Sequence, residues 1–182
     1  MYEHLIEKKI SSEEIFNGKL LHVFRDKVCL PNGKETIREY IKHNGAVAVV
    51  PLFEDGTVLV ERQFRYPFDS VMLEIPAGKI DPGENPLTAA ERELREETGY
   101  VNAKFTPIGE FLPSVAYTTE VIYLYIATGM TDSGVRELDD NEFLDTERIP
   151  LTELVNMVMN GKIRDSKTQT AILKTYLLES AK

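Results

Sequence analysis

The chain has 182 residues, 42% hydrophobic and 28% charged, and its 30 acidic side chains against 21 basic ones give a net charge of −9. This composition excludes a disordered or fibrous protein, and the length suits one domain with a small appendage. The acidic balance disfavours a DNA-binding surface, which needs a basic stripe. The single cysteine, Cys29, excludes an internal disulfide and a zinc site built from several thiolates. The longest apolar run, residues 45–53, is too short to cross a membrane, so we expect a cytoplasmic protein without a DNA or membrane partner.

The first 42 residues are rich in predicted strands. Residues 20–30 and 36–41 flank the turn sequence PNGK at 31–34, which predicts a hairpin. Residues 1–42 carry eight basic and seven acidic side chains, whereas residues 45–100 carry five and eleven. This shift predicts a boundary between an N-terminal β segment, residues 1–42, and a second domain, residues 43–182.

The second domain alternates strands and helices, which predicts a mixed α/β fold. Its first two strands are joined by the turn EDGT at 54–57. An acidic loop is expected at residues 136–147, after the last strand. The predicted strands are 45–53, 58–64, 71–78, 104–112 and 120–128, and the later helices are 151–160 and 166–180.

The clearest helix covers residues 87–98. Asn85 is placed to cap its N-terminus, Pro86 suits its first position, and Gly99 suits its end. Its apolar stripe is Leu87, Ala90 and Leu94.

Three glutamates of this helix share one face, because Glu93, Glu96 and Glu97 stand at i, i+3 and i+4. Like charges at this spacing repel one another. A solvated acidic helix face is one interpretation, and a bound divalent cation with oxygen ligands is the other.

The wider spacing favours the cation. The pattern reads Gly78, five residues, Glu84, seven residues, Arg92-Glu93-Leu94, one residue, Glu96-Glu97, one residue, and Gly99-Tyr100. It resembles the Nudix box at every defining position. The resemblance implies a Nudix α/β/α sandwich with a mixed β-sheet, preceded by a small N-terminal antiparallel sheet.

The resemblance also implies a metal site. Glu93 and Glu97 would be the main Mg²⁺ ligands, with Mn²⁺ as the alternative ion. Glu96 would help to bind a further ion, and the carbonyl of Ala77 would complete the coordination. Arg92 would orient a glutamate, for which Glu84 is the candidate. The family hydrolyses nucleoside diphosphates linked to another group.

Further motifs resemble the ADP-ribose pyrophosphatase branch of the family. They are ERQFRYP at 61–67, LEIPAGKID at 73–81, LDDNEF at 138–143 and GKIRDSKT at 161–168. This resemblance implies hydrolysis of ADP-ribose to AMP and ribose 5-phosphate.

Within that branch, roles are implied for residues outside the box. Arg65 would grip the diphosphate of the substrate. Glu142 or Asp140, in the acidic loop, would steer or deprotonate the attacking water. Glu74 would contact the substrate or support the metal site.

The branch also implies a homodimer formed through the N-terminal strands. Arg38 and Glu39 would then reach the active site of the partner subunit. Phe16 or Tyr40 would stack on adenine, although core packing explains either ring equally well.

The loop at 113–120, PSVAYTTE, departs from the branch because it lacks the family's Ser-Pro-Gly. Other substrates therefore stay open: an ADP-sugar, a dinucleoside polyphosphate or an oxidised nucleotide. A nucleotide-sensing module without catalysis is a further alternative, which the complete box disfavours.

Overall fold

The computed structural model describes residues 2–138 and 142–181. It divides into two compact units. The first runs up to Asn44 and also includes Ser114–Glu120, and the second consists of Gly45–Pro113 and the chain from Val121 onward. Within the described residues, no helix is both long and apolar enough to span a membrane.

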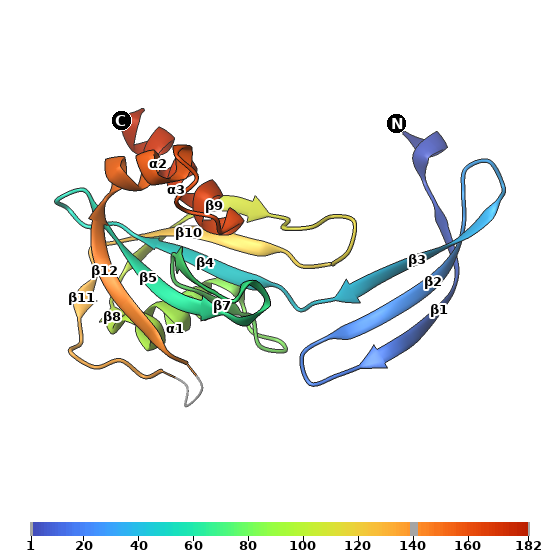
Figure 1. Cartoon of the computed structure of the whole chain (residues 1–182), viewed down its shortest axis with the longest axis horizontal. Helices are drawn as coiled ribbons and strands as arrows, with labels where there is room; N and C mark the ends of the chain where they lie inside the picture. The colour runs from blue at the N-terminus through green and yellow to red at the C-terminus, as the bar shows by residue number, and fades with distance from the viewer. Residues whose placement is uncertain (1, 139–141, 182) are drawn as a thin grey trace. The chain divides into compact units, whose positions relative to one another are not determined.

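The first unit is a three-stranded antiparallel sheet in the order β1-β2-β3, preceded by a short 3-10 helix, η1 (Figure 1). The elements are η1 (Glu3–Leu5), β1 (Lys8–Asn17), β2 (His22–Cys29) and β3 (Glu35–Lys42). The predicted hairpin is β2 and β3. Strand β1 was not predicted as an element, because its side chains are mostly polar, are exposed on both faces and show no alternation, so that only pairing with β2 defines it.

The segment Ser114–Glu120 belongs to the first unit through backbone hydrogen bonds to β3. The Ile41 N–H donates to the Tyr117 carbonyl at 2.8 Å, and the Thr119 N–H donates to the Ile41 carbonyl at 3.0 Å. The predicted boundary assigned this segment to the second domain. Contacts between positions so far apart in sequence leave no local signal, which explains the difference.

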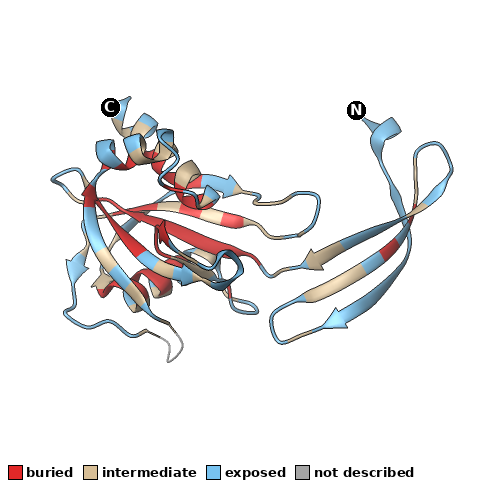
Figure 2. Cartoon of the chain, in the orientation of Figure 1, coloured by how far each residue is buried: buried red, intermediate tan, exposed pale blue. Residues whose placement is uncertain are grey.

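A mixed four-stranded sheet in the order β7-β4-β10-β9 forms the centre of the second unit. Its strands are β4 (Ala46–Pro51), β7 (Ala77–Lys79), β9 (Lys104–Phe111) and β10 (Ile122–Thr128). Strand β4 runs parallel to β10 and antiparallel to β7. Every residue of β4 is buried (Figure 2), because both faces of the strand are covered.

A second sheet, in the order β12-β5-β6, carries the ERQFR motif and the first two residues of LEIPAG, whose Ala77 and Gly78 belong to β7. Its strands are β5 (Thr57–Arg65), β6 (Ser70–Glu74) and β12 (Leu144–Pro150). The smaller elements are η2 (Tyr66–Phe68) and the pair β8 (Tyr100–Val101) and β11 (Thr131–Asp132).

The acidic loop predicted at 136–147 ends earlier than expected, because its last residues belong to β12. Antiparallel pairing of β12 with β5 and an ion pair between Arg62 and Glu147, at 2.6 Å, stabilise this polar strand. Non-local pairing therefore overrides the local composition.

Three helices complete the second unit: α1 (Pro86–Thr98), α2 (Leu151–Met159) and α3 (Ser166–Ser180). Side chains alternate across β4, so Val47 and Val49 pack with α1 while Ala48 and Val50 pack with α2 and α3. The helices thus cover opposite faces of the central sheet (Figure 1). The predicted α/β/α sandwich with a mixed sheet is confirmed.

Helix α1 begins and ends as predicted. The Asn85 side chain accepts a hydrogen bond from the Leu87 N–H at 2.9 Å, and Gly99 adopts φ +77° at the other end. The buried stripe is Ala89, Ala90 and Leu94. Leu87 was expected in this stripe but is exposed, because the buried part of the helix starts two residues later, at Ala89.

Replacing Leu94 by Ala tests the packing of α1 on the sheet. Leu94 is 1% exposed and Leu87 is 41% exposed on the same helix. We expect Leu94→Ala to lower the free energy of unfolding by about 2–5 kcal/mol in urea titrations. The matched control, Leu87→Ala, should lower it by less than about 1 kcal/mol. Equal losses for the two variants would contradict this packing.

Candidate metal-binding and active site

Helix α1 and strand β7 meet so closely that the site requires a glycine. A Cβ added at Gly78 would lie 1.9 Å from both Cδ and Oε1 of Glu93. The buried Glu93 carboxyl therefore occupies the space that a side chain at position 78 would fill. The first glycine of the box fixes the position of this glutamate.

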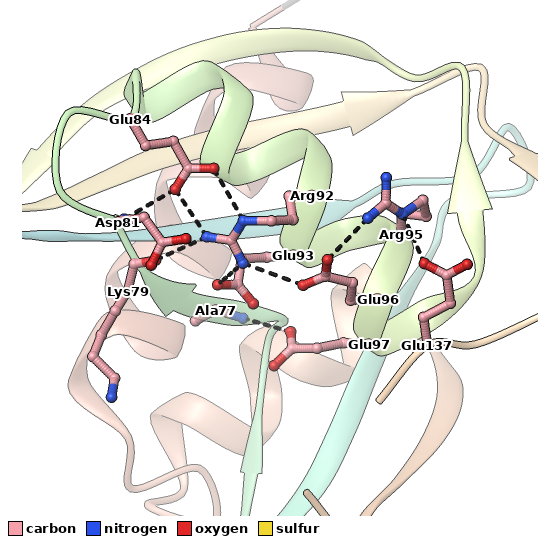
Figure 3. Close-up of polar contacts among 10 residues, drawn as sticks. All are labelled: Ala77, Lys79, Asp81, Glu84, Arg92, Glu93, Arg95, Glu96, Glu97 and Glu137. Carbon is pink, nitrogen blue, oxygen red and sulfur yellow. Dashed lines mark hydrogen bonds and ion pairs between the residues drawn. The ribbon is translucent and has the colours of Figure 1, made fainter. Parts of the chain in front are cut away.

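Arg92, in the middle of α1, connects three carboxyl groups of the Nudix-box segment (Figure 3). Its Nε and Nη2 donate to the two carboxylate oxygens of Glu84 at 3.0 and 2.9 Å. Its Nη1 donates to Glu93 at 2.8 Å and to Glu96 at 3.2 Å. These hydrogen bonds, chiefly the one to Glu84, raise the pKa of Arg92. Arg92 therefore touches the expected partner Glu84 and also holds two of the three helix glutamates.

Glu97 points away from Arg92 and toward β7. It is 2% exposed, and its Oε2 accepts a hydrogen bond from the Ala77 N–H at 3.0 Å (Figure 3). Burial raises the pKa of Glu97, and the charges of Glu61, Glu93 and Glu142 raise it further. The pKa of Glu93 is also raised, mainly by burial. Too few cations surround these buried carboxyl groups to offset the free-energy cost of ionising them away from water.

Glu61 on β5 was missed by the sequence analysis. It is 1% exposed, and within the part of the chain that the structure describes neither of its carboxyl oxygens has a hydrogen-bond partner. Burial is the largest cause that raises its pKa, followed by the charge of Glu74, its cross-strand neighbour. The alternation of strand side chains was the available signal, because it places Glu61 on the same face of β5 as Arg65.

Glu74 on β6 is compensated by two cations. Nε and Nη2 of Arg65 donate to its two carboxylate oxygens, each at 2.7 Å, and Lys167 of α3 forms a further ion pair with it. Burial favours the neutral form of Glu74, but Arg65 and Lys167 together outweigh it and lower its pKa. The sequence analysis missed Lys167, whose location depends on how α3 packs.

This pairing bears on the expected role of Arg65. One edge of its guanidinium is occupied by Glu74, and the side chain remains 40% exposed. Glu74 therefore orients Arg65 and leaves part of it accessible to a bound anion.

The acidic loop contributes Glu142 to the cluster. The charge of Glu142 is among the causes that raise the pKa of Glu61, Glu93 and Glu97, so its carboxyl group lies near all three. The other candidate base, Asp140, lies outside the described residues.

The charged candidates of the N-terminal segment form ion pairs inside the first unit. Arg38 pairs with Glu7 at 2.6 Å, and Glu39 pairs with Arg25 at 2.8 Å. All four side chains are at least one third exposed, so these pairs contribute little stability.

The two aromatic candidates also lie in the first unit. Tyr40 stacks on Phe24 with ring centroids 5.8 Å apart, and its hydroxyl donates to Asp26 at 3.4 Å. Phe16 is exposed at the end of β1. Tyr40 is therefore packed within the sheet, whereas the ring of Phe16 is open to contact.

The donor set of the second unit fits a divalent cation by its chemistry. It is made of carboxylate oxygens. Both oxygens of Glu61 lack a hydrogen-bond partner among the described residues, and the charge of Glu61 helps to raise the pKa of the buried Glu97. Among residues 2–138 and 142–181, no three His, Cys, Asp or Glu side chains converge on a single point. Glu93 is directed to Arg92 and Glu97 to the Ala77 N–H, so side-chain rotation would have to complete the site.

Comparison with known families agrees with this site. Residues 42–169 match the NUDIX domain, and residues 7–41 match the nucleoside diphosphate sugar hydrolase N-terminal domain. The first match covers more than half of the chain, so this chain belongs to the Nudix family.

Individual relatives are similar along most of their length. An ADP-ribose pyrophosphatase of Bacillus subtilis (strain 168) is 39% identical over 97% of this chain and 96% of its own. A methanol dehydrogenase activator of Bacillus methanolicus is 37% identical, with the same coverage of both chains. The crystal structure of an ADP compounds hydrolase superposes with a TM-score of 0.86 at 21% identity, covering 96% of this chain and 95% of that one, which shows the shared fold.

Replacing Gly78 by Ala tests the contact with Glu93. Gly78 is not among the glycines with positive φ, so the added methyl acts through its contact and not through backbone strain. We expect a loss of about 1–3 kcal/mol in the free energy of unfolding, measured in urea. We also expect turnover to fall by about 100-fold as Glu93 is displaced.

The double variant Gly78→Ala with Glu93→Ala separates the two effects. Removing the Glu93 carboxyl should recover the stability lost to the contact and leave activity low. A double variant that is no more stable than Gly78→Ala alone would contradict the proposed clash.

Proposed function

We propose that this protein hydrolyses the diphosphate bond of ADP-ribose to AMP and ribose 5-phosphate, using Mg²⁺. The observation that carries the proposal is the group of buried glutamates, led by Glu97, in the same unit as the partly accessible Arg65. Nudix ADP-ribose pyrophosphatases generally need a divalent metal. The similarity to an ADP-ribose pyrophosphatase along nearly the whole chain supports this substrate.

Each part of the site then has a chemical task. Glu93, Glu96 and Glu97 would hold divalent metal, with the Ala77 carbonyl as a further ligand. Bound there, a divalent cation lowers the pKa of a water molecule and neutralises phosphate oxygens. Arg92 keeps the helix carboxyl groups oriented through the contacts described above.

The remaining residues act on the water and the substrate. Glu142 is the stronger candidate for the base that takes the proton of the attacking water, because its charge acts on the buried cluster; Asp140 is the alternative. Arg65, oriented by Glu74, would bind the diphosphate. One water is consumed, its oxygen bonds to one phosphorus, and the other phosphate leaves with the bridging oxygen.

We further propose that the first unit, as an N-terminal dimerisation segment, pairs two subunits. It exposes Ile10, Phe16 and Ile37, which suit an apolar contact between copies. Arg38 and Glu39 would then reach the partner's site, and Phe16 or Tyr40 would stack on adenine. The unpaired Cys29 is compatible with the reducing cytoplasm as the place of action.

A second candidate substrate is an ADP-sugar or another nucleoside diphosphate derivative. The observation that favours it is the segment Ser114–Glu120, which lacks the Pro-Gly pair and is hydrogen-bonded to Ile41 in the first unit. A different backbone there would change the shape of a ribose pocket without changing the chemistry of the Nudix box.

A substrate panel distinguishes these candidates. ADP-ribose, ADP-glucose, diadenosine polyphosphate and oxidised dGTP are incubated with excess Mg²⁺, and product release is measured with and without EDTA. We expect ADP-ribose to have the highest kcat/KM and EDTA to abolish the activity. A higher kcat/KM for another substrate would transfer the assignment to it, and no cleavage of any substrate would overturn the enzymatic proposal.

Glu97→Gln tests the central carboxylate. The side chain keeps its shape but loses its charge, so we expect turnover to fall by a factor of about 1,000 or more while far-UV circular dichroism is unchanged. Glu91→Gln, at an exposed position of the same helix, should retain full turnover. Near-normal turnover of Glu97→Gln would refute its role as a metal ligand.

A further inference from the structure

Glu61 is a buried acidic residue that has no role in the proposed hydrolysis. It lies in the middle of β5, with Val58 and Val60 of the apolar core as near neighbours in sequence. It is 1% exposed, and both of its carboxyl oxygens lack a hydrogen-bond partner among residues 2–138 and 142–181. Burying a charged or polar group without a partner costs several kcal/mol, whereas an aliphatic side chain at this position would avoid that cost.

The nearest cations do not bond to Glu61. Arg65 and Lys167 both direct their donors to Glu74, the cross-strand neighbour of Glu61. Their charges act on Glu61 only at a distance, and Glu74 and Glu142 oppose them. The ion pairs of this sheet therefore satisfy Glu74 and leave Glu61 with two unused acceptors.

Glu61 also acts on helix α1. Among the neighbouring charges, that of Glu61 has the largest influence on Glu97, ahead of that of Glu93. Two buried carboxyl groups from different elements, β5 and α1, thus act on each other, and among the described residues no donor bonds to either oxygen of Glu61. Oxygen donors in such an arrangement suit a hard divalent ion, which neutralises both.

We infer that Glu61 is an additional ligand of the divalent cation, binding it together with Glu97. The inference rests on the proposed metal-dependent function and extends the metal site from the helix to strand β5. It distinguishes Glu61 from Glu74, whose ion pairs with Arg65 and Lys167 give it a supporting role.

Direct metal binding tests this inference without measuring catalysis. Mn²⁺ is titrated into the metal-free protein, and bound Mn²⁺ is followed by calorimetry and by electron paramagnetic resonance. In Glu61→Gln the shape is retained and the charge is lost, so we expect Kd for Mn²⁺ to rise at least about 10-fold. Glu91→Gln, exposed on α1, should bind as the unmodified protein does.

Stability gives a second measure. If Glu61 binds the cation, Mn²⁺ should raise Tm less in Glu61→Gln than in the unmodified protein. If Glu61 is instead a neutral acid with no role in metal binding, both Kd and the shift in Tm should be unchanged, and the inference is overturned. Absence of Mn²⁺ binding by the unmodified protein is a distinct result, which would overturn the proposed metal-dependent function itself.

Glu61→Asp covers the case in which Glu61→Gln does not fold. It keeps the charge, but the side chain is one methylene shorter, so the carboxylate lies farther from Glu97. We expect weaker Mn²⁺ binding in this variant too, and an unchanged affinity would overturn the inference.

Discussion

The burial of more carboxyl groups than the surrounding cations could neutralise is the constraint on which the second unit depends. Glu61, Glu93 and Glu97 are all removed from water, and burial is the main cause of the raised pKa of each. Such an arrangement is expensive for folding alone. It is held in place by local features that leave little freedom: a glycine at position 78 that makes room for one carboxyl group, and Arg92, which fixes its neighbours.

The unit treats its buried carboxyl groups in two different ways. Glu74 accepts a bidentate pair of hydrogen bonds from Arg65 and forms an ion pair with Lys167, and its pKa is lowered. Glu61, directly across the strand pair, receives neither bond, and its pKa is raised. The opposite pKa shifts of these two neighbours suit different roles. Glu74 is already paired with cations, whereas the carboxyl group of Glu61 still has oxygens that could bind one, as we infer above.

The parts that could be predicted from sequence are those whose signals are local. Asn85, Pro86 and Gly99 determine the ends of α1, and the spacing of the box places Glu93 and Glu97 on one helix face. Strand β12 and the segment Ser114–Glu120 could not be assigned correctly, because each is defined by backbone pairing with a distant part of the chain. Glu61 and Lys167 were missed for the same reason: their importance comes from neighbours on other elements.

The same contrast between local and long-range signals explains why the sequence indicates the class of reaction more directly than the substrate. The residues proposed to bind metal lie on α1, β5 and β7, which pack in the core of the second unit. The segment that departs from the ADP-ribose pyrophosphatase pattern connects β9 to β10 in sequence, yet its hydrogen bonds are made with β3 of the first unit. The proposed metal site and the segment that departs from the family pattern thus belong to different units of the chain. A sequence change in that segment alters backbone that pairs with β3, and it leaves the buried glutamates of the second unit as they are in sequence.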